Sequence, residues 1–352
     1  LFVLQLGPNI LLKGGPDCRF SDATEEFNIP DTSQWSTAFT AWWQNDGLPF
    51  MAVGNYVDLN DPKGPFFACD TLQILEPNGN IYKSNKLEPG FCSLSMLTAK
   101  DASGEMRLRI SNDRQYYVRN GYEQMWDLSD QRFLTEADGW DKFSIWGMGI
   151  ASRDITGDGR DEVVLTSMGD QLLRLANSDG TYKNAPFEIG TYAHKPYFGD
   201  DGRPSTGWHA QFSDINNDGL ADLFIAKGNV DQMPSNAIKD PNNLLIQQTN
   251  GLFQEVGLEA GIASLERGRG AALADFDLDG RIDILVMNRR APMEIYRNVT
   301  KNTGNWLAIQ LVQKGGNINA IGSRITIGKD SQQVTIGGGH AGGQALPIHF
   351  GL

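Results

Sequence analysis

"DFDLDGRID", residues 275–283, places acidic side chains at its first, third, fifth and ninth positions. In a tight loop alternate residues point inward, so these side chains converge and the carbonyl of the seventh residue can join them. Gly280, at the sixth position, permits the sharp turn that such a loop needs. Oxygen donors of this kind and number suit Ca²⁺ better than zinc or copper. The predicted ligands are Asp275, Asp277, Asp279, Asp283 and the backbone carbonyl of Arg281.

Two related loops lie upstream. "DITGDGRDE" occupies residues 154–162 and "DINNDGLAD" occupies residues 214–222, so the three loops start 60 and 61 residues apart. Three loops predict about three Ca²⁺ ions. Loop 154–162 is the weakest candidate, because a threonine replaces the acid at its third position and its ninth residue is the longer glutamate. The predicted ligands are Asp154, Thr156, Asp158, Glu162 and the carbonyl of Arg160 in the first loop, and Asp214, Asn216, Asp218, Asp222 and the carbonyl of Leu220 in the second.

The residues after each loop argue against an EF-hand. An EF-hand needs a bidentate glutamate at its twelfth position and a helix after it. Here the twelfth positions are Leu165, Ile225 and Val286, each inside a short aliphatic run. Strand-like segments also precede the loops, namely "WGMGIASR", "GWHAQFS" and "GRGAALA". Each loop is therefore predicted to be the turn of a β-hairpin.

The same period continues through two further strand-like segments in each unit, such as "NLLIQQTNGLF" at residues 243–253. Four short strands in a repeat of about 60 residues are typical of propeller blades. One such sheet cannot bury both of its faces, but a ring of them can. We therefore predict an all-β fold with a β-propeller over residues 1–300. Because residues 1–3 align with residues 223–225, six blades are visible, and we prefer a seven-bladed ring without its N-terminal part over a six-bladed one.

Two upstream copies of the loop have lost part of the acidic pattern. Residues 45–47 keep the "NDG" turn without the outer acids. The copy that starts at Asp101 carries Arg109 where the ninth-position carboxylate should be. We hypothesise that Arg109 replaces the metal as the local cation, and ordinary surface charge is the alternative.

Composition excludes several classes of partner and cofactor. A formal charge of −13 disfavours binding to nucleic acid, because an acidic surface repels phosphates. No run of 18 apolar residues occurs, so we expect no transmembrane segment. Cys18, Cys69 and Cys92 form no CxxC motif and no cluster with histidine, which argues against zinc. Cys69 and Cys92 are either a disulfide or two buried thiols, and Cys18 is left over.

The pattern D-x-[DN]-x-D-G-x-x-D followed by an aliphatic run resembles FG-GAP/VCBS repeats, as found in the propellers of integrin α-subunits. The tail, with "NWL", "AIGSRITI" and "HFGL" in this order over residues 301–352, resembles the ASPIC/UnbV domain of proteins related to cartilage acidic protein. It departs from that pattern at "GGHAGGQ", where an aromatic residue and Ser-Gln are more typical. The resemblance implies a calcium-stabilised propeller followed by a small, β-sandwich-like domain.

This resemblance also implies a secreted, periplasmic or cell-surface protein that acts in adhesion, in protein interaction or as an accessory subunit of a larger assembly. Millimolar calcium outside the cytosol is consistent with this location, since loops of modest affinity fill there. No shared catalytic residues carry over, and the four histidines form no HExxH or other ligand spacing, so we expect no enzyme. Asn298-Val-Thr300 is a glycosylation sequon that matters only in a eukaryotic secretory context.

Three tryptophans offer an alternative function. Trp35, Trp146 and Trp208 each precede one of the acidic or degenerate turns by a few residues, at the expected start of a blade's innermost strand. Such starts converge around the axis on the face opposite the loops. Together with His209 they predict an aromatic face for a protein side chain or a carbohydrate, which would make the chain a carbohydrate-binding protein or a glycan-active enzyme. The competing interpretation is that these rings only pack between blades.

Overall fold

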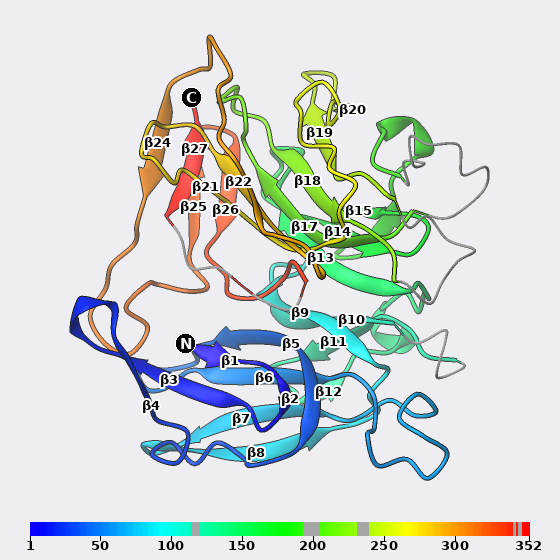
Figure 1. The fold of residues 1–352 in the computed structure, drawn as a ribbon, viewed down its shortest axis with the longest axis vertical. Helices are drawn as coiled ribbons and strands as arrows, with labels where there is room; N and C mark the ends of the chain where they lie inside the picture. The colour runs from blue at the N-terminus through cyan, green and yellow to red at the C-terminus, as the bar shows by residue number, and fades with distance from the viewer. Residues whose placement is uncertain (114–119, 193–204, 231–238, 341–342, 344–346) are drawn as a thin grey trace.

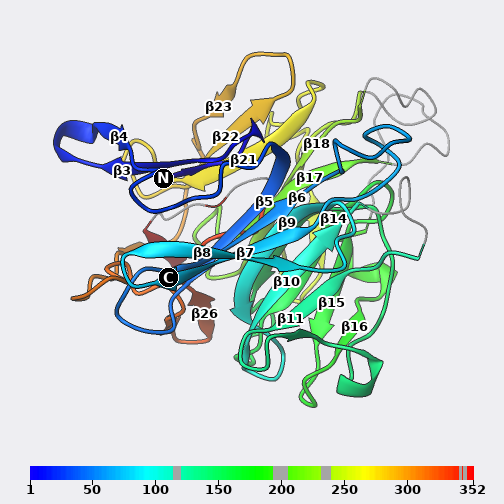
Figure 2. The ribbon, with the colours of Figure 1, turned by 90° about the horizontal axis from the view of Figure 1, so that it is seen from below.

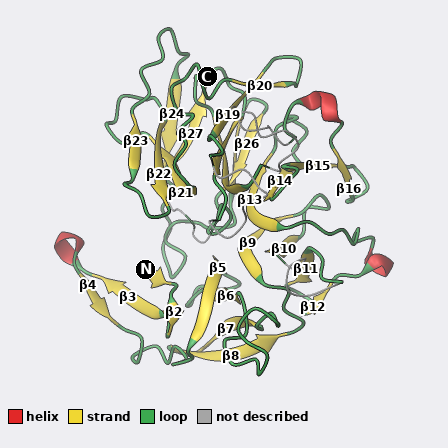
Figure 3. Cartoon of the chain, turned by 45° about the vertical axis from the view of Figure 1, so that its right-hand side comes forward, coloured by secondary structure: helices red, strands yellow, loops and turns green. Residues whose placement is uncertain are grey.

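The computed structural model describes residues 1–113, 120–192, 205–230, 239–340, 343 and 347–352. Strands dominate these residues (Figure 1), and six of their sheets stand around a common centre (Figure 3). The prediction of an all-β propeller with six visible blades is therefore confirmed. Within the described ranges no helix is long and apolar enough to cross a bilayer. The helical elements found there are the 3₁₀ helices η1 (Pro16–Cys18), η2 (Glu136–Asp138) and η3 (Phe187–Ile189).

Two sheets form the N-terminal part of the ring. The first lies at one edge of the molecule (Figure 2), and every pairing in both sheets is antiparallel. The first sheet has the order β1-β3-β4 and contains β1 (Phe2–Val3), β3 (Ile10–Gly14) and β4 (Phe20–Asp22). The second has the order β2-β5-β6-β7-β8 and contains β2 (Leu6–Gly7), β5 (Gln34–Trp42), β6 (Phe50–Asn55), β7 (Leu72–Asn78) and β8 (Ile81–Leu87).

The remaining four blades follow the chain in order, with the first strand of each innermost. The third blade contains β9 (Ser93–Lys100), β10 (Met106–Asn112), β11 (Gln124–Asp127) and β12 (Arg132–Phe133), and the fourth contains β13 (Gly147–Arg153), β14 (Glu162–Ser167), β15 (Leu172–Ala176) and β16 (Tyr182–Asn184). The fifth contains β17 (Gly207–Ser213), β18 (Asp222–Lys227), β19 (Asn243–Gln247) and β20 (Phe253–Glu255), and the sixth contains β21 (Gly268–Ala274), β22 (Asp283–Asn288) and β23 (Glu294–Tyr296). Neighbouring blades contact one another through β5, β9, β13, β17 and β21.

The hydrophobic core lies in layers between consecutive sheets. Val164 and Leu173 of the fourth blade, for example, pack against Leu223, Ile225 and Leu245 of the fifth. Strands β14 and β18 are buried along their whole length, because a neighbouring sheet covers each of their faces. Burial of each large aliphatic side chain contributes about 1.5–3 kcal/mol. The ring therefore supplies the core that a single blade lacks.

Each intact acidic loop is the turn of a hairpin, as predicted. Loops 154–162, 214–222 and 275–283 join β13 to β14, β17 to β18 and β21 to β22. In every case the ninth loop residue starts the second strand and pairs with the residue just before the loop, as Ala274 does with Asp283. The loops are thus held in one common orientation by the strands that they connect.

The C-terminal residues form two small antiparallel sheets, drawn orange to red in Figure 1. These sheets and the residues that connect them contact the turns or strand ends of the second to sixth blades, so the C-terminal part lies on the loop face of the propeller. The sheets contain β24 (Trp306–Ile309) paired with β27 (Ile348–Gly351), and β25 (Arg324–Ile327) paired with β26 (Asp330–Gln333). The contacts with the turns are Gly316 to Asp46, Gln333 to Lys100, Ser331 to Asp154, His349 to Asn217 and Trp306 to Gly280.

From β26 the chain continues into the centre of the ring. Gly337 forms a β-bridge with Leu97 of β9, and Gly339 forms one with Ile150 of β13. The hydroxyl of Thr40, in β5, donates to the carbonyl of Ile336. Residues 336–340 therefore lie along the axis, against the inner strands of three blades. The sequence pattern gave no indication of this course.

The open question about the cysteines has a clear answer. Cys69 and Cys92 form a disulfide, with their Cα atoms 4.7 Å apart, and Cys92 is fully buried. The bond connects the second blade to the residue that directly precedes β9. Both cysteines belong to the hydrophobic cluster that contains Tyr56 and Trp208. Cys18 is exposed and not part of a disulfide.

We predict that the Cys69→Ala, Cys92→Ala double variant is less stable by about 3 kcal/mol, because the bond closes a loop of intermediate length in the unfolded chain. Chemical denaturation under non-reducing conditions measures the change. Cys18→Ala is the control and should unfold like the parent, since that thiol is exposed. Equal stability of the double variant and the control would contradict the prediction.

Candidate metal centre

Loop 275–283 brings three carboxylates together. Oxygens of Asp275, Asp277 and Asp283 lie within 4.8 Å of one another, and no other trio of His, Cys, Asp or Glu side chains in the described ranges does so. Gly280 has a φ of 84°, the left-handed conformation that the predicted turn requires. Carboxylates this close repel one another unless a cation lies between them. Their hard oxygen atoms fit Ca²⁺.

The backbone of each loop fixes the carboxylate at the first position. In loop 275–283 the N–H groups of Asp279 and Gly280 donate to the two oxygens of Asp275, at 2.9 and 2.8 Å. Asp214 and Asp154 accept the same two bonds from the fifth and sixth residues of their own loops. The first-position oxygens are therefore preorganised by the turn itself.

The ninth-position carboxylate joins the loop to the third strand of its blade. One of its oxygens accepts the N–H of the second loop residue, and the other accepts an N–H at or just beyond the end of the third strand. Hydrogen bonds to a charged group contribute about 1.5–3 kcal/mol each. The donors are Ile155 and Ala176 for Glu162, Ile215 and Gln247 for Asp222, and Phe276 and Asn298 for Asp283.

Several of these carboxylates are buried. Asp214 and Asp222 are fully inaccessible and Glu162 nearly so. Loss of solvation raises the pKa of Asp214 to about 6 and the pKa of Glu162 to about 7, and neighbouring carboxylates add to both shifts. The same loss of solvation raises the pKa of Asp222 well above its usual range. Since a buried carboxylate is costly without a countercharge, these loops also fit a divalent cation.

The outer positions of the loops face arginines of the chain. Asp279 pairs with Arg281 and Arg297, and Arg297 also lies 2.6 Å from Asp277. In loop 154–162, Asp158 pairs with Arg160. Exposed ion pairs of this kind contribute little to stability, so they do not prevent these aspartates from turning toward a metal ion.

In loops 154–162 and 214–222, no third carboxylate lies beside those of the first and ninth positions. Thr156 is exposed, and Asn216 donates to Asp218 at 2.9 Å. Neutral side chains at the third position explain why only loop 275–283 gathers three acids. When bound, Ca²⁺ would supply positive charge to the first- and ninth-position carboxylates of all three loops. The remaining ligands proposed from the sequence, including the carbonyls of Arg160, Leu220 and Arg281, stay predictions.

The hypothesis about Arg109 is wrong. The cation beside Asp101 is Arg107, whose Nε lies 3.4 Å from Oδ2 of that aspartate. Arg109 lies two residues further along β10, where its guanidinium is covered by the rings of Trp140 and Tyr182, at 5.3 and 4.9 Å from their centroids. The aromatic rings, which the loop pattern does not contain, decide where this side chain goes.

The three tryptophans lie in one cluster at the axis. Trp35 and Trp146 are half-buried, and Trp208 is 8% exposed. Arg269 lies 4.0 Å from the Trp208 ring centroid, and the ring of His340 meets that indole edge-on at 4.8 Å. Trp208 is thus covered by the chain's own side chains. A ligand on this face stays a prediction.

His209 belongs to the same cluster. Its Nδ1 accepts the backbone N–H of His340 at 3.3 Å. Burial lowers the pKa of both histidines to about 4, so both imidazoles are neutral near pH 7. His209, the neighbour of Trp208 in β17, is thus paired with the C-terminal segment, and its role in binding a ligand stays a prediction.

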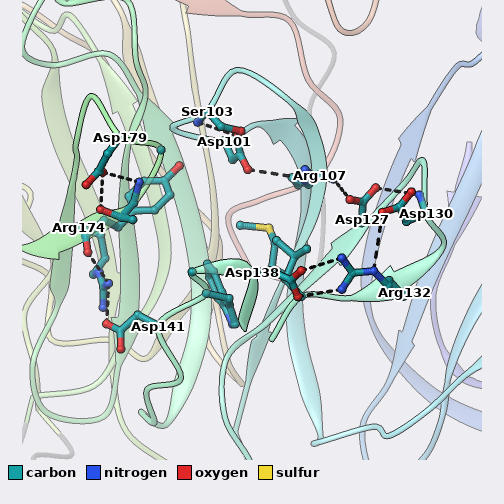
Figure 4. Close-up of a pocket in the computed structure, with 17 residues that line it drawn as sticks. Asp101, Ser103, Arg107, Asp127, Asp130, Arg132, Asp138, Asp141, Arg174 and Asp179 are labelled. Carbon is teal, nitrogen blue, oxygen red and sulfur yellow. Dashed lines mark hydrogen bonds and ion pairs between the residues drawn. The ribbon is translucent and has the colours of Figure 1, made fainter. Parts of the chain in front are cut away.

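A polar pocket of about 350 Å³ lies between the third and fourth blades (Figure 4). Its charged side chains pair with one another: Arg132 with Asp138, Arg174 with Asp141. Arg107 bridges Asp101 and Asp127 in the same pocket. The residues come from separate strands and turns of both blades, so no local motif could have predicted the pocket.

The sequon is engaged by the fold. The side-chain amide of Asn298 donates to the carbonyls of Ile215 and Ile282, at 2.8 and 3.2 Å. Its oxygen accepts the N–H of Thr300. Attachment of a glycan at Nδ2 would remove one of its two hydrogens and with it one of these two bonds, so this asparagine has a structural role between the fifth and sixth blades.

Comparison with known proteins identifies the repeats. Residues 154–225 and 214–286 match the FG-GAP-like repeat. A stretch of 57 residues is 42% identical to Cartilage acidic protein 1 of Mus musculus and covers 16% of this chain and 9% of that protein. The fold is similar to the crystal structure of the exotype rhamnogalacturonan lyase YesX, with a TM-score of 0.41 and 12% sequence identity, over 96% of this chain and 56% of that one.

The chain is thus a β-propeller that contains FG-GAP-like repeats, and this part of the predicted resemblance is confirmed. The matched stretch covers less than a tenth of the cartilage protein, and the structural similarity covers about half of the lyase chain. The ASPIC/UnbV resemblance of residues 301–352 and the domain boundary at residue 300 stay predictions.

The raised pKa values predict how pH affects stability. The metal-free folded protein keeps protons on Asp214 and Glu162 at pH values where the unfolded chain has lost them, so its stability falls as pH rises from about 4 to about 7. Each unit of upward shift costs the ionised form about 1.4 kcal/mol. Calcium offsets this cost, and the increase in Tm on adding Ca²⁺ should be larger at pH 8 than at pH 5. Thermal unfolding with EGTA or Ca²⁺ at both pH values measures it, and equal increases would refute it.

Proposed function

We propose that this chain is an extracytoplasmic, calcium-binding propeller whose rigid faces bind other proteins, as an adhesion or interaction module or as an accessory subunit of a larger assembly. The observation that carries the calcium assignment is the convergence of Asp275, Asp277 and Asp283 within 4.8 Å. The two related loops, with their preorganised first and ninth carboxylates, support the same assignment. No catalysis is part of this proposal.

Calcium has a structural role in this proposal. Each ion would lie where the first strand of a blade turns into the second, at carboxylates that already hold the turn and the third strand. Binding to the folded state alone stabilises it by about 2.7 kcal/mol when free calcium is one hundred times Kd. A ring stiffened at successive blades keeps the shape of its faces, which favours specific protein contacts.

The disulfide, the expected calcium affinity of the loops and one sequence match support a location outside the cytosol. The Cys69–Cys92 disulfide is typical of secreted, periplasmic and cell-surface proteins, because the cytosol keeps thiols reduced. Calcium loops of modest affinity fill at the millimolar concentrations outside the cell. The match to Cartilage acidic protein 1 is consistent with this location.

The second candidate is binding or cleavage of carbohydrate at the axial aromatic face. It is favoured by the exposure of Phe66 and Phe67, which are 49% and 62% accessible, and by the edge-on contact of Phe66 with Trp35. Exposed aromatic rings stack on sugars and on protein side chains alike. Glycan binding that is lost in Trp35→Ala would favour this candidate over a protein partner.

We predict that the Asp275→Asn, Asp277→Asn double variant binds one fewer Ca²⁺ ion than the parent, because two of its three converging carboxylates are neutral. Isothermal titration calorimetry gives the stoichiometry. The control is Asp17→Asn, Asp31→Asn, which removes the same charge from exposed residues outside the three loops. An unchanged stoichiometry in the loop variant, or a parent that binds no calcium, would overturn the assignment.

The protein partner is tested separately. The chain is purified from its source in Ca²⁺, and every co-purified protein is identified and quantified, with a parallel purification in EGTA. A stoichiometric partner that dissociates in EGTA supports the interaction function. Calcium binding with no stoichiometric partner, together with glycan binding that depends on Trp35, would favour the second candidate.

A further inference from the structure

The C-terminal segment, residues 304–340 and 347–352, covers the acidic loops. Near loop 154–162, the hydroxyl of Ser331 donates to Oδ2 of Asp154 at 3.2 Å. Arg324 pairs with Asp161 at 2.8 Å, and Asp330 accepts two bonds from Arg153 at 2.9 and 2.8 Å. Asp161 and Arg153 are only 2% and 5% exposed. These ion pairs are thus buried between the propeller and the segment.

Loop 214–222 is covered more closely still. Gly351 lies directly on Asp214, since a Cβ atom built on that glycine would overlap Oδ2 of the aspartate. His349 hydrogen-bonds Oδ1 of Asn217 at 2.7 Å, and the amide of Asn217 donates to the carbonyl of Gly280 at 2.9 Å. Asp214 and Asn217 are fully inaccessible. Since Trp306 lies against Gly280, one segment touches the loops of the fifth and sixth blades at the same time.

The C-terminal segment lies on two of the negatively charged side chains of the loops. Asp154 and Asp214 are proposed calcium ligands, and docking of the segment removes water from both. Burial of an uncompensated carboxylate is costly, whereas a bound divalent cation offsets the cost. Docking is consequently easier when the cation is present. Thermodynamic linkage requires the converse as well: the docked segment must raise the affinity for the cation by the same factor.

We propose that calcium binding to loops 154–162 and 214–222 and docking of the C-terminal segment on the propeller are coupled, each favouring the other. This inference rests on the proposed calcium binding. Removal of calcium would loosen the segment over the loops and also at the axis, where residues 336–340 lie against β9 and β13. The axial cluster around Trp208, now covered by His340, would then become accessible.

Hydrogen exchange of the full chain tests the coupling without any substitution. The amides of Gly338 and Gly339 donate to the carbonyls of Met96 and Ile150, at 2.7 and 2.6 Å, and report docking at the axis. They should exchange at least about tenfold faster in EGTA than in Ca²⁺, in the usual range of coupling between sites. The amides of β14 and β18 should stay protected in both. Equal exchange rates of Gly338 and Gly339 in EGTA and in Ca²⁺ would overturn the coupling. A loss of protection in EGTA that affects β14 and β18 as much as the segment would also overturn it.

A single methyl group tests the reciprocal effect. Gly351→Ala places a Cβ against Asp214 in the docked segment and should weaken calcium affinity about tenfold. Gly14→Ala is the matched control, because its added Cβ would make only an ordinary contact, 3.7 Å from Phe20. The affinity is measured by competition with a fluorescent chelator, and exchange at the amides of Gly338 and Gly339 verifies that docking of the segment has weakened.

The outcomes separate this inference from the proposed function. If the parent chain binds no calcium, the proposed function fails. If the parent binds calcium but Gly338 and Gly339 exchange equally with and without it, only the coupling fails. An affinity of Gly351→Ala within twofold of the control, despite faster exchange at Gly338 and Gly339, would also overturn the coupling. Should this variant not fold, the exchange experiment on the parent chain decides alone.

Discussion

The carboxylate at the ninth position of each acidic loop is the constraint on which the blades depend. Through its two oxygens it holds the turn and the end of the third strand, as Asp222 does with the N–H groups of Ile215 and Gln247. A neutral residue there would leave buried N–H groups without acceptors, at a cost of about 1–3 kcal/mol for each. The same carboxylate is buried, and its negative charge is costly there unless a positive charge lies nearby.

Within the described residues, arginines supply positive charge to some acidic side chains, and calcium is proposed to supply it to others. Arginines serve some acids: Arg107 beside Asp101 in the third blade, and Arg324 beside Asp161 under the C-terminal segment. Asp275 and Asp283 in loop 275–283, and Asp214 and Asp222 in the fifth blade, have no arginine partner among the ion pairs of the described residues, whereas Asp277 pairs with Arg297. These unpaired carboxylates are among the ligands proposed for calcium. Along one repeated design, Arg107 thus lies beside the first-position carboxylate of the third blade, whereas calcium is proposed at the corresponding positions of the intact loops.

The C-terminal segment gives the loop face a second role. It contacts the turns of five blades and then follows the axis, so the face that would hold calcium is an internal interface as well as a possible external one. Protein contacts of the chain should consequently be sought on the opposite face and on the outer edges of the blades. The aromatic cluster on the axis is shaped by the same segment, since His340 covers Trp208.

The sequence by itself determined the repeat, the hairpin at each loop and the ring, because these follow from local turn chemistry and from the need of a four-stranded sheet to bury both faces. It also placed Asp275, Asp277 and Asp283 in one group, since alternate residues of a tight loop point inward. Only the tertiary structure decided that Arg107 and not Arg109 accompanies Asp101, that Cys69 and Cys92 are joined, and that residues 336–340 occupy the axis. These outcomes depend on contacts between residues that are distant in the chain, for which a single sequence carries no local pattern.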